Sequence, residues 1–181
     1  MKLTTYIQYT EAIKYMEAVE RAPYTLNTLV TINIEMLGVP AKNCSAYLRE
    51  SLQRLKKLLA RRECPWSAVW VLENSLKSKV HAHVIIHRNE FFLRDHCYFR
   101  RLLKQALGFV RYPAKMLQFT AFRKYLPYAL NLERVMNYSL KGIRPEVAKS
   151  LCLYWKPQGK IYGKRIGWYR YDKEERISHA C

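Results

Sequence analysis

Two histidines, His81 and His83, stand one residue apart within the apolar run VHAHVIIH, which extends from Val80 to His87. In a β-strand, alternate side chains point to the same face, which would place these two imidazoles about 6–7 Å apart. Imidazoles at that separation can turn onto a single metal ion. His87 is expected at the surface near the end of the strand. The alternative is a pair of half-exposed strand histidines that hydrogen-bond with their neighbours.

A nearby carboxylate offers a third ligand. The segment Trp66–Asn74, the polar turn SLKSK and the histidine run together predict a β-hairpin. If its turn centres near Lys77, Glu73 lies across from His81, and cross-strand neighbours on one face are about 5 Å apart. Two imidazoles and a carboxylate suit Mn²⁺, Zn²⁺, Fe²⁺ or, with help from water, Mg²⁺. A solvated hairpin charge is the alternative for Glu73.

The hairpin lies among segments that alternate between helical and strand patterns. The predicted elements are a helix over residues 8–21, a strand over Thr28–Met36, a helix that buries Leu48, Leu52, Leu55 and Leu59, a helix over Asp95–Leu107 with Asp95 as N-cap, a strand over Lys115–Phe122, a helix over Pro127–Gly142 and another that opens at Pro145. Helices and strands intermixed, with one antiparallel hairpin, indicate an α+β fold with a central antiparallel sheet flanked by helices.

Charge is the strongest feature of the composition. The chain carries 32 Lys and Arg against 14 Asp and Glu, a formal net charge of +18. Such a charge is tolerated most easily beside a polyanion, with nucleic acid the leading candidate and an anionic membrane surface second. No apolar run approaches the ~20 residues of a membrane helix. No segment has the pattern of a basic amphipathic membrane helix either, because the positive charge is spread along the whole chain, so no membrane partner is expected.

Length and cysteine content add two further expectations. At 181 residues, the chain is expected to form a single domain over residues 1–181. Its five cysteines include no C-x-x-C pair, which indicates reduced thiols and a cytoplasmic location.

Three blocks of the sequence resemble, in order, the motifs of the HUH endonucleases, metal-dependent nickases that include rolling-circle replication initiators, relaxases and related transposases. LVTINIE (Leu29–Glu35) is similar to the first motif, His81–His83 to the His-hydrophobic-His motif, and NYSLKG (Asn137–Gly142) to the third, a Tyr-x-x-Lys on a helix. The resemblance spans about residues 28–142 and favours the single-tyrosine replication initiators, which commonly place a third ligand where Glu73 stands.

The resemblance implies a ferredoxin- or RRM-like HUH nuclease fold that binds Mn²⁺ or Mg²⁺ through Glu73, His81 and His83. It also implies that Tyr138 attacks a DNA phosphodiester and keeps the 5′-phosphate as a phosphotyrosine, which conserves the bond energy for rejoining. A free tyrosine has a pKa near ~10, so only about a thousandth is phenolate at neutral pH. Lys141, expected on the same helix face, could favour the phenolate or hold the phosphate.

The implied activity is sequence- and strand-specific nicking and joining of single-stranded DNA, which initiates rolling-circle replication of a plasmid, phage or satellite. The DNA partner would be a single strand or a hairpin origin. Because the chain has no G-x-x-x-x-G-K-[ST] motif, a helicase from the host or the element is a further expected partner. The alternative for Tyr138 is a helical packing residue, and its nearest rivals as nucleophile are Tyr125 and Tyr128.

The C-terminal segment, residues 153–181, interleaves aromatic rings with Lys and Arg. Single-stranded bases stack on such rings while cations follow the phosphates. The candidate DNA-binding residues are Lys160, Lys164, Arg165, Trp168, Tyr169 and Arg170. A final edge strand followed by a solvated tail explains the same segment equally well.

Two other functions also fit the residues. A non-catalytic nucleic-acid-binding protein would use the same basic, aromatic surface. A two-His-one-carboxylate metalloenzyme acting on small molecules would use Glu73, His81 and His83, but would leave the charge and the Tyr138–Lys141 pair without a role.

Overall fold

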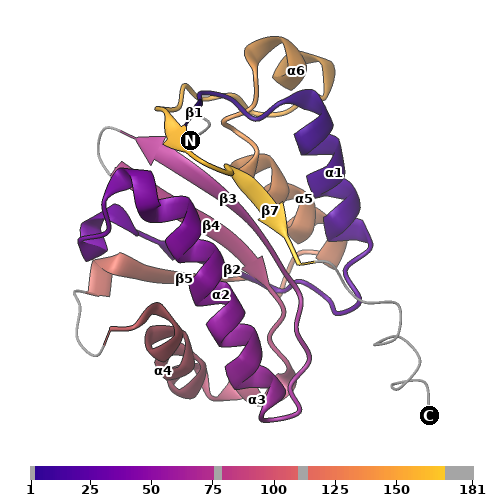
Figure 1. Ribbon diagram of the computed structural model, residues 1–181. Coiled ribbons are helices and arrows are strands. Elements are labelled where there is room, and N and C mark those ends of the chain that lie inside the picture. The colour runs from indigo at the N-terminus through magenta and orange to yellow at the C-terminus, as the bar shows by residue number, and fades with distance from the viewer. Residues whose placement is uncertain (1–2, 76–78, 110–113, 170–181) are drawn as a thin grey trace.

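The computed structural model describes residues 3–75, 79–109 and 114–169, and its centre is a five-stranded sheet (Figure 1). The sheet order is β5-β2-β4-β3-β7, and each neighbouring pair is antiparallel. Its strands are β2 (Thr28–Ile32), β3 (Ala68–Ser75), β4 (Lys79–Ile86), β5 (Leu117–Ala121) and β7 (Ile166–Trp168). A two-stranded sheet pairs β1 (Leu3–Thr4) with β6 (Ile161–Tyr162). The predicted α+β class with a central antiparallel sheet is confirmed.

Helices cover both faces of the sheet (Figure 1). One face is covered by α2 (Cys44–Ala60), α3 (Glu90–Arg94) and α4 (His96–Leu107). The other is covered by α1 (Tyr9–Glu20), α5 (Tyr128–Ser139) and α6 (Pro145–Ser150). Short 3₁₀ turns occur at Glu35–Leu37, Ala41–Asn43 and Ala114–Met116. Each face buries its own hydrophobic core, so the sheet separates two apolar layers.

Two of the predicted helices on the first face form for the expected reasons. In α2 the predicted leucine stripe, Leu48, Leu52, Leu55 and Leu59, is buried against the sheet. In α4 the side chain of Asp95 accepts a hydrogen bond from the backbone N–H of Tyr98 at 2.8 Å, as an N-cap does. The helix α3 was not predicted from the sequence.

The predicted strand over Thr28–Met36 is wrong in its second half, because β2 ends at Ile32. The following residues turn into a 3₁₀ helix that closes at Gly38 in the left-handed region, with φ of 85°. Ile34 is still fully buried with the residues of β2, so the alternating apolar pattern continues where the extended backbone does not. The side chain of Glu35 accepts the N–H of Val80 at 3.0 Å, which ties this turn to the start of β4.

The register of the β3–β4 hairpin agrees with the predicted turn centre at Lys77. Ser75 pairs with Lys79, and Glu73 pairs with His81. The turn residues 76–78 lie outside the described residues. Side chains of β4 alternate between the two cores, so that Val84 faces α2 and α4 while His83 faces the side of α5.

The predicted helix over Pro127–Gly142 is shorter at its C-terminal end. It ends at Ser139, so Lys141 lies in the following turn and not on the helix. Leu140 and Ile143 are both fully buried, and Ile143 forms a parallel β-bridge with Ile7. The chain leaves the helix because both apolar side chains must enter the core on this face of the sheet.

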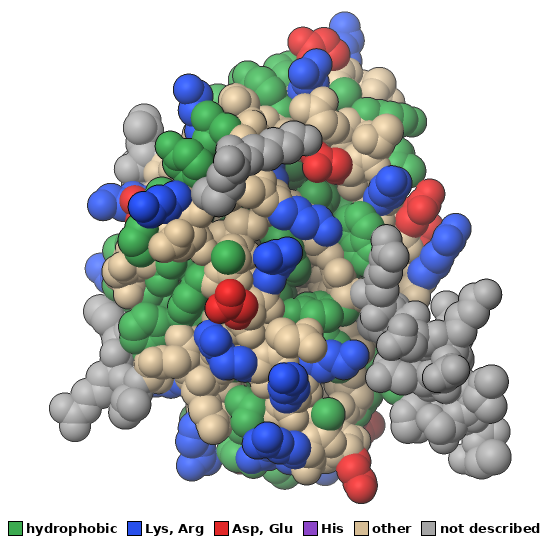
Figure 2. Space-filling model, in the orientation of Figure 1, with side chains coloured by type: hydrophobic (Ala, Val, Ile, Leu, Met, Phe, Trp, Pro, Cys, Tyr) green, Lys and Arg blue, Asp and Glu red, His purple; other side chains and the backbone are tan. Residues whose placement is uncertain are grey.

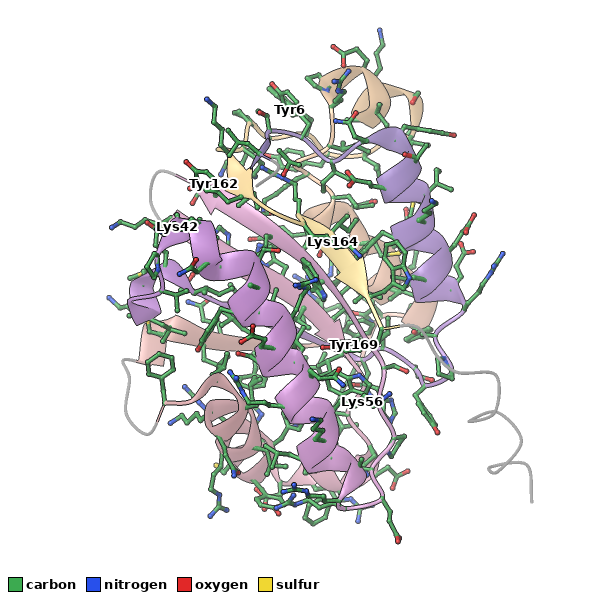
Figure 3. All side chains as sticks on the ribbon, in the orientation of Figure 1. Tyr6, Lys42, Lys56, Tyr162, Lys164 and Tyr169 are labelled. Atoms are coloured by element: carbon green, nitrogen blue, oxygen red, sulfur yellow. The ribbon has the colours of Figure 1, made fainter. Side chains whose placement is uncertain are left out.

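The C-terminal run contributes β6 and β7, and β7 forms an edge of the main sheet beside β3. The edge-strand interpretation therefore holds for residues 166–168. Figure 3 shows Tyr162, Lys164 and Tyr169 distributed along this C-terminal run. Arg170 and the rest of the tail lie outside the described residues.

Basic side chains are scattered over the face that carries α2 and are not gathered into one patch (Figure 2). None of the helices in the described part of the chain combines the length and the apolar character that a membrane crossing needs. The four cysteines in the described ranges, Cys44, Cys64, Cys97 and Cys152, are free thiols, as predicted.

Candidate metal and tyrosine site

The hairpin brings three metal-ligating side chains to one point on the sheet. Glu73 of β3 lies directly across from His81 of β4, and His83 follows two residues later on the same face. One ligand atom from each of the three residues lies within 4.8 Å of the other two. All three residues are buried, with 1%, 6% and 1% of their surface exposed for Glu73, His81 and His83. The predicted convergence of these residues is thus present.

One carboxylate oxygen of Glu73 is the centre of the cluster. Its Oε2 atom lies 3.1 Å from Nε2 of His81, 3.3 Å from Nε2 of His83 and 2.9 Å from Nζ of Lys141. The other oxygen, Oε1, is buried and has no hydrogen-bond partner among the described residues. Nε2 of His83 also lacks an aligned hydrogen bond within that part of the chain. Buried polar atoms without partners are costly, which indicates a binding site for a cation.

The hydrogen bonds of the histidines test whether a metal fits. Nδ1 of His81 lies 2.9 Å from the backbone carbonyl of Lys79 and must donate its proton to that oxygen. A neutral His81 then presents the lone pair of Nε2 to the carboxylate of Glu73. Nδ1 of His83 is likewise engaged, 3.1 Å from the hydroxyl of Thr31. Both Nε2 atoms are oriented by bonds at the opposite nitrogen, as in metal-bound histidines, and the cluster can hold a metal ion.

The charges around Glu73 keep its carboxylate ionised. Burial on its own would raise the pKa of Glu73, but the polar contacts with His81 and His83 and the positive charge of Lys141 outweigh burial. The pKa of Glu73 is therefore held far below its ordinary value. Burial also lowers the pKa of His83 against the opposing effect of Glu73, which favours the neutral imidazole that a metal requires.

Tyr138 lies against this cluster from the last turn of α5. Its ring centroid is 4.8 Å from that of His83, edge to face, and Nζ of Lys141 is 3.5 Å from its centroid. Tyr138 is 47% exposed, in contrast to the buried cluster. The turn that follows α5 thus brings Lys141 to both Tyr138 and Glu73, although Lys141 is not helical. The rival tyrosines lie elsewhere, because Tyr128 packs beside Phe122 and Tyr125 is 76% exposed.

A cleft of about 650 Å³ contains these groups. Glu73, His81, Tyr138 and Lys141 line one part of it, and residues 156–159 line another. A larger hollow of about 890 Å³ lies along α4, on the opposite face of the sheet, and contains none of these residues. The cleft over the cluster is therefore the place where a ligand could meet the tyrosine and the metal-ligating residues together.

The candidate DNA-binding residues separate into three places. Lys160 is exposed and directly follows the cleft lining. Lys164, Trp168 and Tyr169 line a groove of about 290 Å³ beside α2, where Nζ of Lys164 lies 5.0 Å from the Trp168 ring centroid. Arg165 is buried, at 1% exposure, and donates hydrogen bonds to the backbone carbonyls of Thr4 in β1 and of Gly159. Its guanidinium therefore faces the interior and not the surface.

Two parts of the site were not found from the sequence. Thr31 orients His83, yet it is only one of several polar residues on the predicted wet face of β2, and the β2–β4 register was needed to single it out. The cleft lining at residues 156–159 is joined to the site by a backbone hydrogen bond from Lys156 to the carbonyl of Lys141, at 2.9 Å. No local pattern signals such a contact.

His87 lies outside the cluster, as predicted. Its Nδ1 is 2.8 Å from the backbone carbonyl of Thr25, and its ring lies 5.4 Å from that of Tyr24. The site is thus defined by a buried carboxylate and two imidazoles beside a half-exposed tyrosine and a lysine. No protein-family model, curated protein sequence or solved structure matches this chain.

Proposed function

We propose that this protein is a metal-dependent endonuclease that nicks and rejoins single-stranded DNA through a 5′-phosphotyrosine. In this proposal the activity is specific for sequence and strand, and it initiates rolling-circle replication of a plasmid, phage or satellite. The single observation that carries the proposal is the contact of Tyr138 with both His83 and Lys141 in the cleft above the buried cluster.

The position of Tyr138 suits a nucleophile better than a packing residue. A packing tyrosine buries its ring, whereas 47% of the surface of Tyr138 is exposed. An ammonium group lies 3.5 Å from its ring centroid, and a cation so placed favours negative charge on the phenol as it reacts. The adjacent cluster contacts the ring through His83. These are the features that nucleophilic attack on a phosphodiester needs.

In the proposed reaction, Oη of Tyr138 forms a bond to phosphorus while the bond to the 3′-oxygen breaks. The phenol gives up its proton to solvent and the leaving 3′-oxygen gains one, so the products are a phosphotyrosine and a free 3′-hydroxyl. The reverse reaction rejoins the strand without another energy source, because the phosphotyrosine retains the phosphodiester bond energy. A divalent cation held by Glu73, His81 and His83 would supply Lewis acidity toward the phosphate.

We assign Mn²⁺ or Mg²⁺ as the cation within this proposal. A donor set of two imidazoles and one carboxylate leaves coordination positions for water and phosphate oxygens, which both ions accept. The net charge of +18 supports a polyanionic substrate. A helicase from the host or the replicon would supply the unwinding that the proposed origin requires.

The experiment is a covalent-capture assay with the full chain. The protein is incubated with Mn²⁺ and a pool of single-stranded oligonucleotides that includes hairpins, then separated under denaturing conditions. We expect a detergent-resistant protein–DNA adduct that Tyr138→Phe loses. Tyr125→Phe is the matched control, because Tyr125 is exposed and does not line the cleft, and it should retain the adduct.

Two outcomes would contradict the proposal. An adduct retained by Tyr138→Phe would exclude Tyr138 as the nucleophile. Binding without an adduct across the whole pool would favour the second candidate function, a non-catalytic nucleic-acid-binding protein, for which the net charge is the supporting observation.

A further inference from the structure

Residues 156–159, which we call the cleft wall, line the cleft but take no part in the proposed chemistry. The cleft wall is fixed to the site at both ends. The backbone N–H of Lys156 donates to the carbonyl of Lys141 at 2.9 Å, and the N–H of Gly159 donates to the carbonyl of Asn74 at 2.8 Å. Nη2 of the buried Arg165 donates to the carbonyl of Gly159 at 2.6 Å. The cleft wall is therefore held in place by hydrogen bonds to the residues around the cleft.

Close packing holds the cleft wall against the residues next to the cluster. A Cβ atom added at Gly159 would lie 2.9 Å from Cγ of Asn74, the residue that follows Glu73. A Cβ added at Gly142 would lie 2.8 Å from Cγ of Gln158, so the side chain of Gln158 packs on the turn that carries Lys141. A Cβ at either position would force the neighbouring side chain to shift, so glycine at these two positions allows the close approach of the cleft wall.

Two side chains of the cleft wall have polar groups that are not used by any atom of the described residues. Lys156 is exposed, and its ammonium has no ion pair or hydrogen bond within the described ranges. Oε1 of Gln158 is buried and has no hydrogen-bond partner among the described residues. A buried acceptor without a donor costs free energy unless a ligand supplies the donor. A cation and an unused acceptor thus lie together in one cleft.

We propose that the cleft wall is a subsite for the nucleotide next to the cleaved bond. Lys156 binds its phosphate, and Oε1 of Gln158 accepts a hydrogen bond from an N–H group of its base. Each of the four bases carries such a donor, so this subsite holds a base without selecting one sequence. The proposal rests on the proposed function for the identity of its ligand, a single DNA strand.

The test measures binding and cleavage separately in the same samples. The full chain is titrated, in EDTA, into two fluorescent 12-mers: one of mixed single-stranded sequence and one made only of abasic sugar-phosphate units. We expect Lys156→Ala to weaken binding of both 12-mers about tenfold and to reduce the salt dependence by about 0.7 in slope, the value for one phosphate contact on a single strand. Lys149→Ala, an exposed lysine outside the cleft, should change neither.

Gln158→Leu should weaken binding of the base-containing 12-mer and leave binding of the abasic 12-mer unchanged. If Lys156→Ala and Lys149→Ala bind DNA with equal affinity and equal salt dependence, the proposed subsite is wrong. It is also wrong if Gln158→Leu changes the affinity for both 12-mers equally. Because Lys156 is exposed, Lys156→Ala is expected to fold. If Gln158→Leu is unstable, the binding measured for Lys156→Ala alone tests the subsite. Mn²⁺ is then added and the covalent adduct is scored: Lys156-dependent binding without an adduct would contradict the proposed function but support the subsite.

Discussion

Nζ of Lys141 lies 2.9 Å from Oε2 of Glu73, and both residues are buried, with 5% and 1% of their surface exposed. This contact joins the turn after α5 to the middle of the sheet. The same Nζ lies 3.5 Å from the Tyr138 ring centroid, so one lysine contacts both the metal-ligating carboxylate and the candidate nucleophile. Lys141 is therefore a buried cation in direct contact with Glu73 that offsets its negative charge.

The contact predicts a large effect of Lys141→Met on stability. Removal of one partner from a buried ion pair leaves the other charge uncompensated, and we expect the free energy of unfolding without added metal to fall by about 3 kcal/mol. Added Mn²⁺ should stabilise this variant more than the wild type, because the ion supplies positive charge where Lys141 no longer does. Urea denaturation with and without Mn²⁺ measures both effects.

Lys149→Met is the matched control for this prediction. It removes one positive charge and keeps a side chain of similar length, but Lys149 is exposed at the end of α6. The free energy of unfolding of Lys149→Met should differ from that of the wild type by no more than about 0.5 kcal/mol. Lys141 does not balance the charge of Glu73 if the free energy of unfolding falls equally in Lys141→Met and Lys149→Met. The same conclusion follows if Mn²⁺ stabilises Lys141→Met and the wild type equally.

Metal binding predicts a second stability effect. An ion that binds only the folded protein raises the free energy of unfolding by about 2.7 kcal/mol at a concentration one hundred times its Kd. Mn²⁺ should therefore raise the Tm of the wild type, EDTA should reverse the rise, and Glu73→Gln or His83→Gln should abolish it. Differential scanning fluorimetry over a Mn²⁺ titration is the measurement.

The chain offers a control histidine for the metal experiment. His87 lies at the end of β4 with its Nδ1 bound to the carbonyl of Thr25, outside the cluster. His87→Gln should keep the full rise in Tm with Mn²⁺. If Glu73→Gln and His83→Gln respond to Mn²⁺ as the wild type does, the cluster is not the binding site.

The ligand cluster could be predicted because its determinants are local. A strand repeats every two residues, and a turn centred at Lys77 is enough to place Glu73 opposite His81. The position of Tyr138 beside His83 could not be derived in this way, since it depends on how α5 packs against the sheet. Only the order and spacing of the motifs, together with the lysine three residues after it, pointed to that tyrosine.

The remaining differences arise from tertiary contacts that a sequence does not display. Arg165 stands in a run of exposed basic residues, but the pairing of β7 with β3 turns it inward to bond the carbonyls of Thr4 and Gly159. Lys141 leaves the helix because its neighbour Leu140 enters the core. Local sequence preference would place Arg165 on the surface and Lys141 on the helix, but the burial of neighbouring residues overrides this preference.

The pairing of β7 with β3 predicts that Gly167→Ala destabilises the protein. Gly167 lies directly opposite Trp70, and an added Cβ would lie 2.6 Å from Cε2 of the buried indole ring. Overpacking of this kind costs about 1–3 kcal/mol. The smaller ring of Trp70→Phe leaves room for the methyl group. The decrease in the free energy of unfolding of the double variant should therefore be smaller, by at least about 0.5 kcal/mol, than the sum of the decreases in the two single variants. Urea denaturation of the four proteins gives this difference, and strictly additive losses would show that the indole does not limit the approach of β7.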